Sequence, residues 1–418
     1  MARLRFGRYD YASFICFFAY AACSVILPVS LVPLAAELGF SLEEGGMTAG
    51  GAMQLGRTIS MLLIMLSCGF IAGHIGKRWT MGLSVLVMGI GIMTCAISPS
   101  YWILFIAMSI AGMGEGVIEG LATPFIQDLH TDEPGRYINF THSFWSVGVV
   151  VTVLVVGALL SMGVSWRVLL ASAAGLSILT SLIYLAPQRE GKEYPDHPER
   201  IHWSITLNHA KDIITTRHFW LFFAAMFFAG GGEFGITFWT ASFIQLNFVS
   251  AAWAGGVGTA CFAGGMFLGR SGWGFFIKQH QLKYLVAYSA ASAALITLAL
   301  PFVQGLWVLF VLLFLTGVCV APFWPSVQSY STNRLHERDT TMIFILLSCA
   351  GIPGCGVITW LMGLLGNIGG LRMSFFVIPA CFAILAILIT ADIVYARAQS
   401  RRQSKQALAP ESEESSLC

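Results

Sequence analysis

Charged side chains are scarce in this chain of 418 residues. Asp, Glu, Lys and Arg make up 11% of it, whereas soluble proteins carry about 25%. A soluble protein of this length needs more charge than that to cover its surface, and 56% of the residues here are hydrophobic. The shortage therefore predicts that most of the exterior faces lipid.

The sequence also lacks the motifs of the common enzyme and cofactor classes. It contains no C-x-x-C pair, no C-x-x-C-H haem motif, no H-E-x-x-H metal motif and no G-x-x-x-x-G-K-[ST] phosphate loop. Nine of the ten cysteines lie unclustered within apolar segments, where cysteine behaves as a small hydrophobic residue. We therefore expect no metal, no cofactor, no enzymatic activity and no nucleic-acid partner, and ATP is not the expected energy source.

Long hydrophobic runs dominate the chain instead. Each has about 20 or more residues, which is enough for a helix to cross a hydrocarbon core of about 30 Å. The first run follows a basic start and is too long for the apolar part of a signal peptide, so we interpret it as a membrane helix. The predicted helices cover residues 11–37, 47–74, 79–97, 101–129, 135–160, 166–186, 218–245, 251–276, 284–303, 306–330, 341–365 and 371–396.

A polar break at residues 187–217 divides these helices six and six. We expect an N-terminal six-helix bundle (1–186), a cytoplasmic linker at the break, a C-terminal six-helix bundle (218–397) and an unstructured cytoplasmic tail (398–418).

A weak internal repeat agrees with this division. Ala-Gly-Gly occurs at residues 49–51 and 254–256, and Pro-Phe occurs at 124–125 and 322–323, with offsets of 205 and 198 residues. The predicted fold is therefore an all-α membrane protein of twelve transmembrane helices in two pseudo-symmetric six-helix halves. A site between two such halves is a common plan for transporters.

The basic residues predict the orientation. With the N-terminus placed in the cytoplasm, 19 of the 23 Lys and Arg residues fall in cytoplasmic segments, and only Arg167 and Arg372 fall in external loops. Because cytoplasmic loops of membrane proteins are rich in Lys and Arg, we expect both termini inside the cell. Arg57 and Arg270 lie within predicted helices.

Two glutamates lie four residues apart in the fourth predicted helix. Glu115 and Glu119 therefore share a helix face, and glycines at 112, 116 and 120 form a neighbouring stripe suited to close packing. Ionisable residues deep in membrane helices are costly and usually functional, and two adjacent carboxyl groups rarely both ionise. We expect these two to carry protons; the alternative is that they pair with Arg57 or bond a neighbouring helix.

A third membrane glutamate, Glu233, lies in the glycine-rich sequence GGGEFG at residues 230–235. The glycines are expected to loosen or break the seventh helix at mid-membrane, which would point to a binding site. Thr237 follows on the same face as Glu233. The alternative is a glycine packing seam around a buried glutamate.

Arg57 lies in the outer part of the second helix, three residues after Gln54. It could neutralise Glu115 or Glu233, or bind an anionic substrate, and the structural ion pair is the favoured interpretation.

The fifth helix carries Asn139, His142 and Trp145 at helical spacing. His142 could bind a substrate hydroxyl or relay protons, and Trp145 could stack on a sugar ring. An interhelical bond and an interfacial aromatic explain the same residues equally well.

The turn between the second and third helices carries glycines and a basic pair. Residues 69–78 read GFIAGHIGKR, which resembles the signature of the major facilitator superfamily at this turn. Gly73 stands where that signature has an acidic residue. The resemblance implies gating residues, which we place at Gly69, Gly73, Gly76, Lys77 and Arg78, and we add Arg270 to this group.

Within the superfamily the chain is most similar to the fucose permease and hexose–proton symporter branch. Residues 118–125 (IEGLATPF) resemble that branch's fourth helix, residues 142–148 (HSFWSVG) its fifth, and Gly232-Glu233 with Trp239 its seventh. The resemblance implies that Glu119 takes part in proton and sugar handling.

These observations predict a secondary transporter, most simply a proton-coupled symporter of a sugar or similar polar organic solute. Efflux of drugs or metabolites by the same fold is the main alternative, and a membrane sensor that does not transport is a further one. We expect a monomer in a bacterial inner membrane whose partners are the solute, protons and the lipid bilayer. The predicted proton carriers are Glu119, Glu115 and Glu233, and the predicted substrate contacts are His142, Trp145, Asn139, Thr237, Trp239, Gln54 and Arg57.

Overall fold

The computed structural model describes residues 5–130, 134–188, 194, 203–335 and 340–407. Throughout these residues the secondary structure is helical, with no strand. The first half contains α1 (Arg8–Glu37), α2 (Met47–Ile75), α3 (Lys77–Ile97), α4 (Tyr101–Leu129), α5 (Pro134–Ser161) and α6 (Trp166–Leu185). The remainder contains α7 (Trp203–Ile214), α8 (Arg217–Asn247), α9 (Ala252–Phe276), α10 (Leu282–Ala299), α11 (Leu306–Val320), α12 (Phe323–Arg334), α13 (Thr340–Ser374) and α14 (Val377–Ala407).

The predicted twelve-helix membrane fold is confirmed. Eleven helical segments of the described chain are long and apolar enough to cross a membrane, and one of them, Leu306–Arg334, joins α11 and α12. The twelfth is α9, whose 25 residues occupy the predicted span 251–276 and include eight glycines. The remaining helix, α7, lies within the predicted linker.

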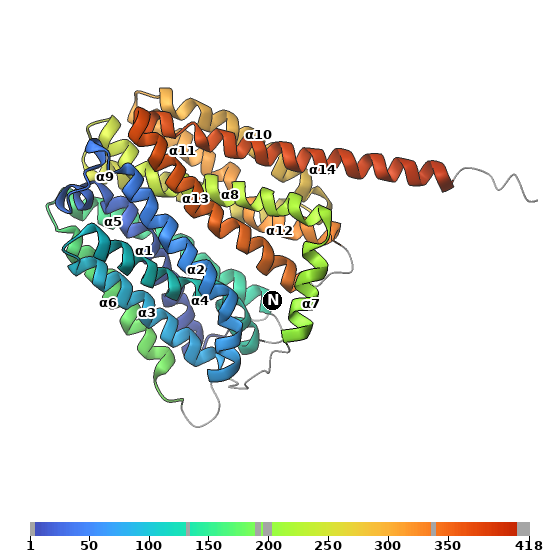
Figure 1. Cartoon of the computed structure of the whole chain (residues 1–418), viewed down its shortest axis with the longest axis horizontal. Helices are drawn as coiled ribbons and strands as arrows, with labels where there is room; N and C mark the ends of the chain where they lie inside the picture. Colours follow the sequence, from blue (N-terminus) through green and yellow to red (C-terminus); the bar gives the residue numbers. More distant parts are fainter. Residues whose placement is uncertain (1–4, 131–133, 189–193, 195–202, 336–339, 408–418) are drawn as a thin grey trace, which may run out of the picture.

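Three local predictions were wrong. The glycines of α8 do not break it, because α8 is one continuous helix and Gly230 and Gly231 pack directly on the backbone of α13. The α13 helix continues past residue 365 as far as Ser374, with a kink at Gly370, where φ is +78°. The tail is helical as far as Ala407, as α14 runs beyond the bundle (Figure 1).

The same helix pairs pack in each half. In the first bundle α2 packs on α4, α3 on α4 and α6, and α1 on α5 and α6. In the second bundle the corresponding pairs are α9 on α11, α10 on α11 and α14, and α8 on α13 and α14. Because the helix pairs correspond, the two bundles share one packing arrangement. They lie side by side (Figure 1). The exact domain boundaries proposed above remain a prediction.

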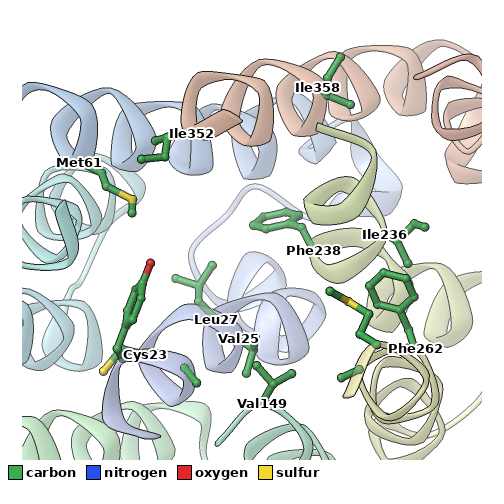
Figure 2. Close-up of a cluster of buried hydrophobic side chains, with 14 of the residues drawn as sticks. Cys23, Val25, Leu27, Met61, Val149, Ile236, Phe238, Phe262, Ile352 and Ile358 are labelled. Atoms are coloured by element: carbon green, nitrogen blue, oxygen red, sulfur yellow. The ribbon is translucent and has the colours of Figure 1, made fainter. Parts of the chain in front are cut away.

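The halves meet mainly through three helix pairs, α2 with α13, α5 with α9, and α1 with α8. Figure 2 shows buried apolar side chains of both halves in one cluster, including Leu27 and Val149 from the first half and Phe238 and Phe262 from the second. We call the end of the bundle that carries α7 the linker end, and the opposite end, where α1 ends and α2 begins, the distal end.

Five hydrogen bonds join described residues of opposite halves, and all of them lie at the distal end. The structure is therefore closed at the distal end.

The predicted glycine stripe of α4 lies against α2. A Cβ atom at Gly116 would sit closer to the carbonyl oxygen of Met61 than real contacts allow, and Gly112 meets the backbone of Arg57 in the same way. Small residues let membrane helices approach until their backbones touch, which here fixes α4 against α2.

Replacing Gly116 by Ala is expected to lower the free energy of unfolding by about 1–3 kcal/mol, because the added methyl group overpacks this contact. Gly175 on α6 is the matched control, since a Cβ atom there meets nothing within 4 Å. Gly175→Ala should leave stability unchanged or raise it by up to about 1 kcal/mol through helix propensity. Denaturant unfolding of the purified protein followed by circular dichroism measures both; equal stabilities for the two variants would refute the packing role.

Candidate functional site

A fully buried ion pair joins α2 to α4. Arg57 and Glu115 are each 2% exposed, and the Arg57 Nε atom donates to Glu115 Oε2 at 2.7 Å while Nη2 donates to Oε1. The same guanidinium donates to the hydroxyl of Ser24 on α1 at 3.1 Å. Of the two partners considered for Arg57, the structure selects Glu115. Both charges are compensated, and neither is accessible to a solute in this conformation.

One helical turn nearer the linker end, Glu119 has a different environment. Its side chain is exposed, although it lies on a central helix, and its protein contact is a hydrogen bond of 3.4 Å from the hydroxyl of Tyr20 on α1. Among the described residues no cation forms a salt bridge with Glu119. The guanidinium of Arg270, on the opposite half, lies within electrostatic reach of it. Glu119 is thus the accessible member of the glutamate pair.

Glu233 of α8 pairs with Arg270 of α9. The distance from Arg270 Nη2 to Glu233 Oε1 is 3.3 Å, with side-chain exposures of 34% and 15%, and Glu233 Oε2 is buried without a described hydrogen-bond partner. Arg270 also donates from Nε to the carbonyl oxygen of Ala321 at 3.3 Å. That carbonyl is available because Pro325, four residues later, has no N–H to donate to it. This proline in the first turn of α12 therefore helps to hold Arg270 in the central region.

Three predicted substrate contacts line the region between the halves. His142 on α5 is exposed, and its Nε2 lies 3.2 Å from the hydroxyl of Thr123 on α4. Trp145 of α5 and Thr237 of α8 line one small cavity, which has a volume of about 10 Å³. A volume of about 10 Å³ holds about one water molecule. The cavity is therefore too small to hold a solute, and it marks a place where the two halves contact each other.

Two further predicted contacts lie elsewhere. Trp239 is fully buried, donates from Nε1 to the carbonyl oxygen of Thr359 at 3.0 Å and packs against Gly50 of the other half. Gln54 is also buried, and its Oε1 has no described hydrogen-bond partner. Both residues belong to the closed distal contact. The side chain of Asn139 lies outside the described residues.

The predicted gating turn is a single-residue break between α2 and α3. Gly69 and Gly73 lie in the last turns of α2, and Gly76 connects the helices with φ of +85°, a conformation that glycine adopts most easily. Lys77 bonds Asp128 of α4 at 2.9 Å, and Arg78 donates to the carbonyl oxygen of Tyr184 on α6 at 2.8 Å. The basic pair thus ties α3 to two helices of its own half, whereas Arg270 lies far along the chain in the central region.

A buried acid in the second half was not among the predicted site residues. The carboxylate of Asp392 on α14 is fully buried and accepts hydrogen bonds from Tyr330 and Arg334, and it lies 2.5 Å from His218. An acid inside the last apolar run was the available signal. Tyr20, the partner of Glu119, was also missed, because a tyrosine in an apolar helix gives no such signal.

Comparison with known proteins places this geometry in a family. The family model described as the Major Facilitator Superfamily matches residues 12–296. A probable polyol transporter of Arabidopsis thaliana is 32% identical over 117 residues. That match covers 27% of this chain and 22% of the plant protein, so the chain matches about a fifth of its relative's length.

Solved structures share the fold along most of the chain. A bacterial homologue of the human lysosomal transporter Spinster superposes with a TM-score of 0.73 at 16% identity, covering 92% of this chain and 96% of that one. The Escherichia coli fucose:proton symporter gives a TM-score of 0.61 at 16% identity, with coverages of 91% and 98%. The chain belongs to the major facilitator superfamily, and it is a multi-pass membrane transporter and not an enzyme.

Proposed function

We propose that this transporter couples the movement of a small polar organic solute to the movement of protons in the same direction. The observation that carries the proposal is the contrast between two glutamates on one face of α4. Glu115 is locked to Arg57, whereas Glu119 is exposed and has no described salt bridge. A proton carrier must reach solvent to gain and lose its proton, and only Glu119 of this pair does so here.

Glu119 faces a cation from the opposite half. When Glu119 loses its proton, its charge attracts Arg270, which among the described residues is held by Glu233 at 3.3 Å and by one carbonyl group. Opposite charges at a protein surface attract more strongly than in bulk water, because the protein beside them lowers the effective dielectric constant. Protonation of Glu119 would weaken this attraction between the halves and so couple the proton to their relative movement. Glu233 then serves as the resting partner of Arg270.

The surrounding side chains suit a hydroxylated solute. His142 and Thr123 offer hydrogen-bonding groups on the first half, and Trp145 offers an aromatic face. On the second half the Thr237 hydroxyl, which is buried here and donates to the carbonyl oxygen of Glu233 at 3.0 Å, can still accept a hydrogen bond once the halves separate. Sites for polar ligands combine apolar or aromatic surfaces with a few such groups. A polyol transporter and a fucose:proton symporter among the similar proteins favour the same class of solute.

The energetics suit accumulation. Each proton that enters down a membrane potential of about 100 mV, negative inside, supplies about 2.3 kcal/mol. That free energy supports roughly fifty-fold accumulation of a neutral solute per proton.

We place the linker end in the cytoplasm of a bacterial cell, with the protein in the inner membrane as a monomer. The excess of Lys and Arg at this end supports the placement. The closed distal end then makes this conformation inward-facing. In the alternate, outward-facing state, Lys77 and Arg78 would help to close the cytoplasmic side. Gln54 and Trp239 would then become accessible from outside.

Two alternatives predict different results. An exporter of apolar or cationic compounds would not alkalinise the medium when sugar is added, whereas a sugar–proton symporter would. A sensor would bind its ligand without moving it, and a flux assay in liposomes separates binding from transport.

Replacement of Glu119 by Gln should abolish proton-driven accumulation and leave exchange of solute without a gradient intact. Glutamine mimics the protonated acid with little change of volume, so the solute can still cross but no proton accompanies it. Glu115→Gln is the matched control from the same face and should retain coupling if the protein folds. Paired uptake and counterflow in proteoliposomes test this; accumulation by the Glu119→Gln protein would transfer the role to Glu233.

Arg57→Ala should destabilise the protein by about 3–5 kcal/mol even without solute, because it leaves Glu115 buried and unpaired. A double variant that replaces both residues by Leu should recover most of this loss, since it leaves no charge. Unfolding measurements in detergent compare the three proteins. Normal stability of Arg57→Ala together with lost solute affinity would instead make Arg57 a substrate contact.

The orientation is tested separately by reporter fusions after residue 196 and after Ser400. Both should report the cytoplasm, because both positions lie within segments that contain several Lys and Arg residues. A reporter signal from outside the cell at either position would contradict the proposed topology.

A further inference from the structure

Two hydrogen bonds at the distal end cross between the halves in matching ways. Asn367, near the distal end of α13, accepts from the backbone N–H of Met47, the first residue of α2, with an N–Oδ1 distance of 3.0 Å. Ser161, the last residue of α5, accepts from the backbone N–H of Trp253 in the first turn of α9, with an N–Oγ distance of 2.8 Å. Each half thus provides a side-chain acceptor for a backbone N–H group in the first turn of a helix in the other half.

Neither of these helices can cap itself. The residue before α2 is Gly46 and the residue before α9 is Ala251, and neither has a polar side chain that could accept from the first turn. The first N–H groups of any helix lack a partner within the helix. Asn and Ser are among the residues that satisfy such groups best. The missing caps of α2 and α9 are therefore supplied across the interface.

The two caps occupy equivalent positions in the internal repeat. Asn367 follows Ser161 by 206 residues, and Trp253 follows Met47 by the same number. This shift agrees with the offset of 205 between the two Ala-Gly-Gly segments. The arrangement is reciprocal, since the fifth helix of each half caps the second helix of the other.

Equivalent glycines bring the capping residues within reach. Gly363 on α13 and Gly157 on α5 are again 206 residues apart. A Cβ atom at Gly363 would collide with the carbonyl oxygen of Met47, and one at Gly157 would lie 3.0 Å from that of Ala252. On the α2 side the Asn367 amide also donates to the carbonyl oxygen of Gly45 at 2.6 Å and to the hydroxyl of Thr48 at 2.7 Å.

We propose that Asn367 and Ser161 form a two-point latch that holds the distal end closed by capping α2 and α9 from the opposite half. Separation of the halves at this end breaks both caps at once and leaves two helix starts to be hydrated. The two residues therefore act as positioning residues that set the balance between the two orientations of the transporter. The latch rests on the proposed function, because it requires that the halves alternate.

The test compares Asn367→Ala, Ser161→Ala and the double variant in full-length protein reconstituted in lipid nanodiscs without solute. Ser165→Ala is the matched control, because Ser165 caps α6 through the N–H of Arg167 within its own half. Hydrogen–deuterium exchange with mass spectrometry reports each region separately. The segments to compare are residues 47–51 and 253–257 at the distal end and residues 119–126 and 140–146 nearer the linker end.

The latch predicts reciprocal changes. Exchange at both distal segments should rise by about fivefold in the single variants and about thirtyfold in the double variant, while exchange nearer the linker end falls. Ser165→Ala should affect only the start of α6. Faster distal exchange without slower exchange nearer the linker end would reduce the two residues to local caps and overturn the latch, as would no change.

The readout needs no transported solute. A reciprocal shift in a protein that moves no polar solute with protons would keep the latch and reject the proposed function. Proton-coupled transport without the reciprocal shift in exchange would keep the proposed function and reject the latch.

Discussion

A charge inside the bilayer is stable only when a partner compensates it, and this constraint sorts the central residues of the transporter. Arg57 and Glu115 satisfy each other completely and act as a fixed joint between α2 and α4. Glu233 and Arg270 satisfy each other in part, since one Glu233 oxygen has no described partner. Among the described residues, Glu119 has a hydrogen bond from one tyrosine hydroxyl and no salt bridge, and its side chain is exposed. The order from fixed to responsive follows from compensation alone, without reference to any relative.

The two halves share a frame but not their charges. Besides the repeated helix pairs, Arg167 donates to carbonyl groups at the end of α3, and Arg372, 205 residues later, donates to the carbonyl group of Pro301 at the end of α10. These arginines hold equivalent positions at the distal end. The interior differs, because α4 carries two glutamates and its counterpart α11 carries none. Because the two halves pack alike, the transporter can adopt two orientations of similar packing. Because their charges differ, protonation can favour one orientation over the other.

Much of the fold could be predicted from the sequence, because lipid imposes long apolar runs and basic loops that are visible without partners. The glycine stripe of α4 was predicted for the same reason, as its spacing is local. The glycines of α8 were wrongly predicted to break the helix, because a packing seam and a broken helix have the same composition. The two cases are distinguished only by the contact of these glycines with α13, which the sequence does not show. Gln54 and Trp239 were assigned to the site because a sequence does not say which end of a two-state protein is closed. Arg270 could be noticed, but its contact with the carbonyl group freed by Pro325 depends on two distant helices.

The closed distal contact contains its own opposing terms. Gly50 and Thr58 of α2 both touch the second half, and Gln54, four residues from each, lies on the same face with a buried oxygen that has no described partner. The hydroxyl of Thr359 on α13, in the same contact, also has no described hydrogen-bond partner. Each such group destabilises the closed contact by about 1–3 kcal/mol while it is buried without a hydrogen bond. This cost disappears when the contact opens and water can bond the group. The reciprocal caps, the glycine contacts and the buried apolar surface act in the other direction. A carrier needs its two orientations to be close in free energy, because a fully satisfied closed contact would trap one of them; unsatisfied polar groups opposed by two breakable caps meet that requirement.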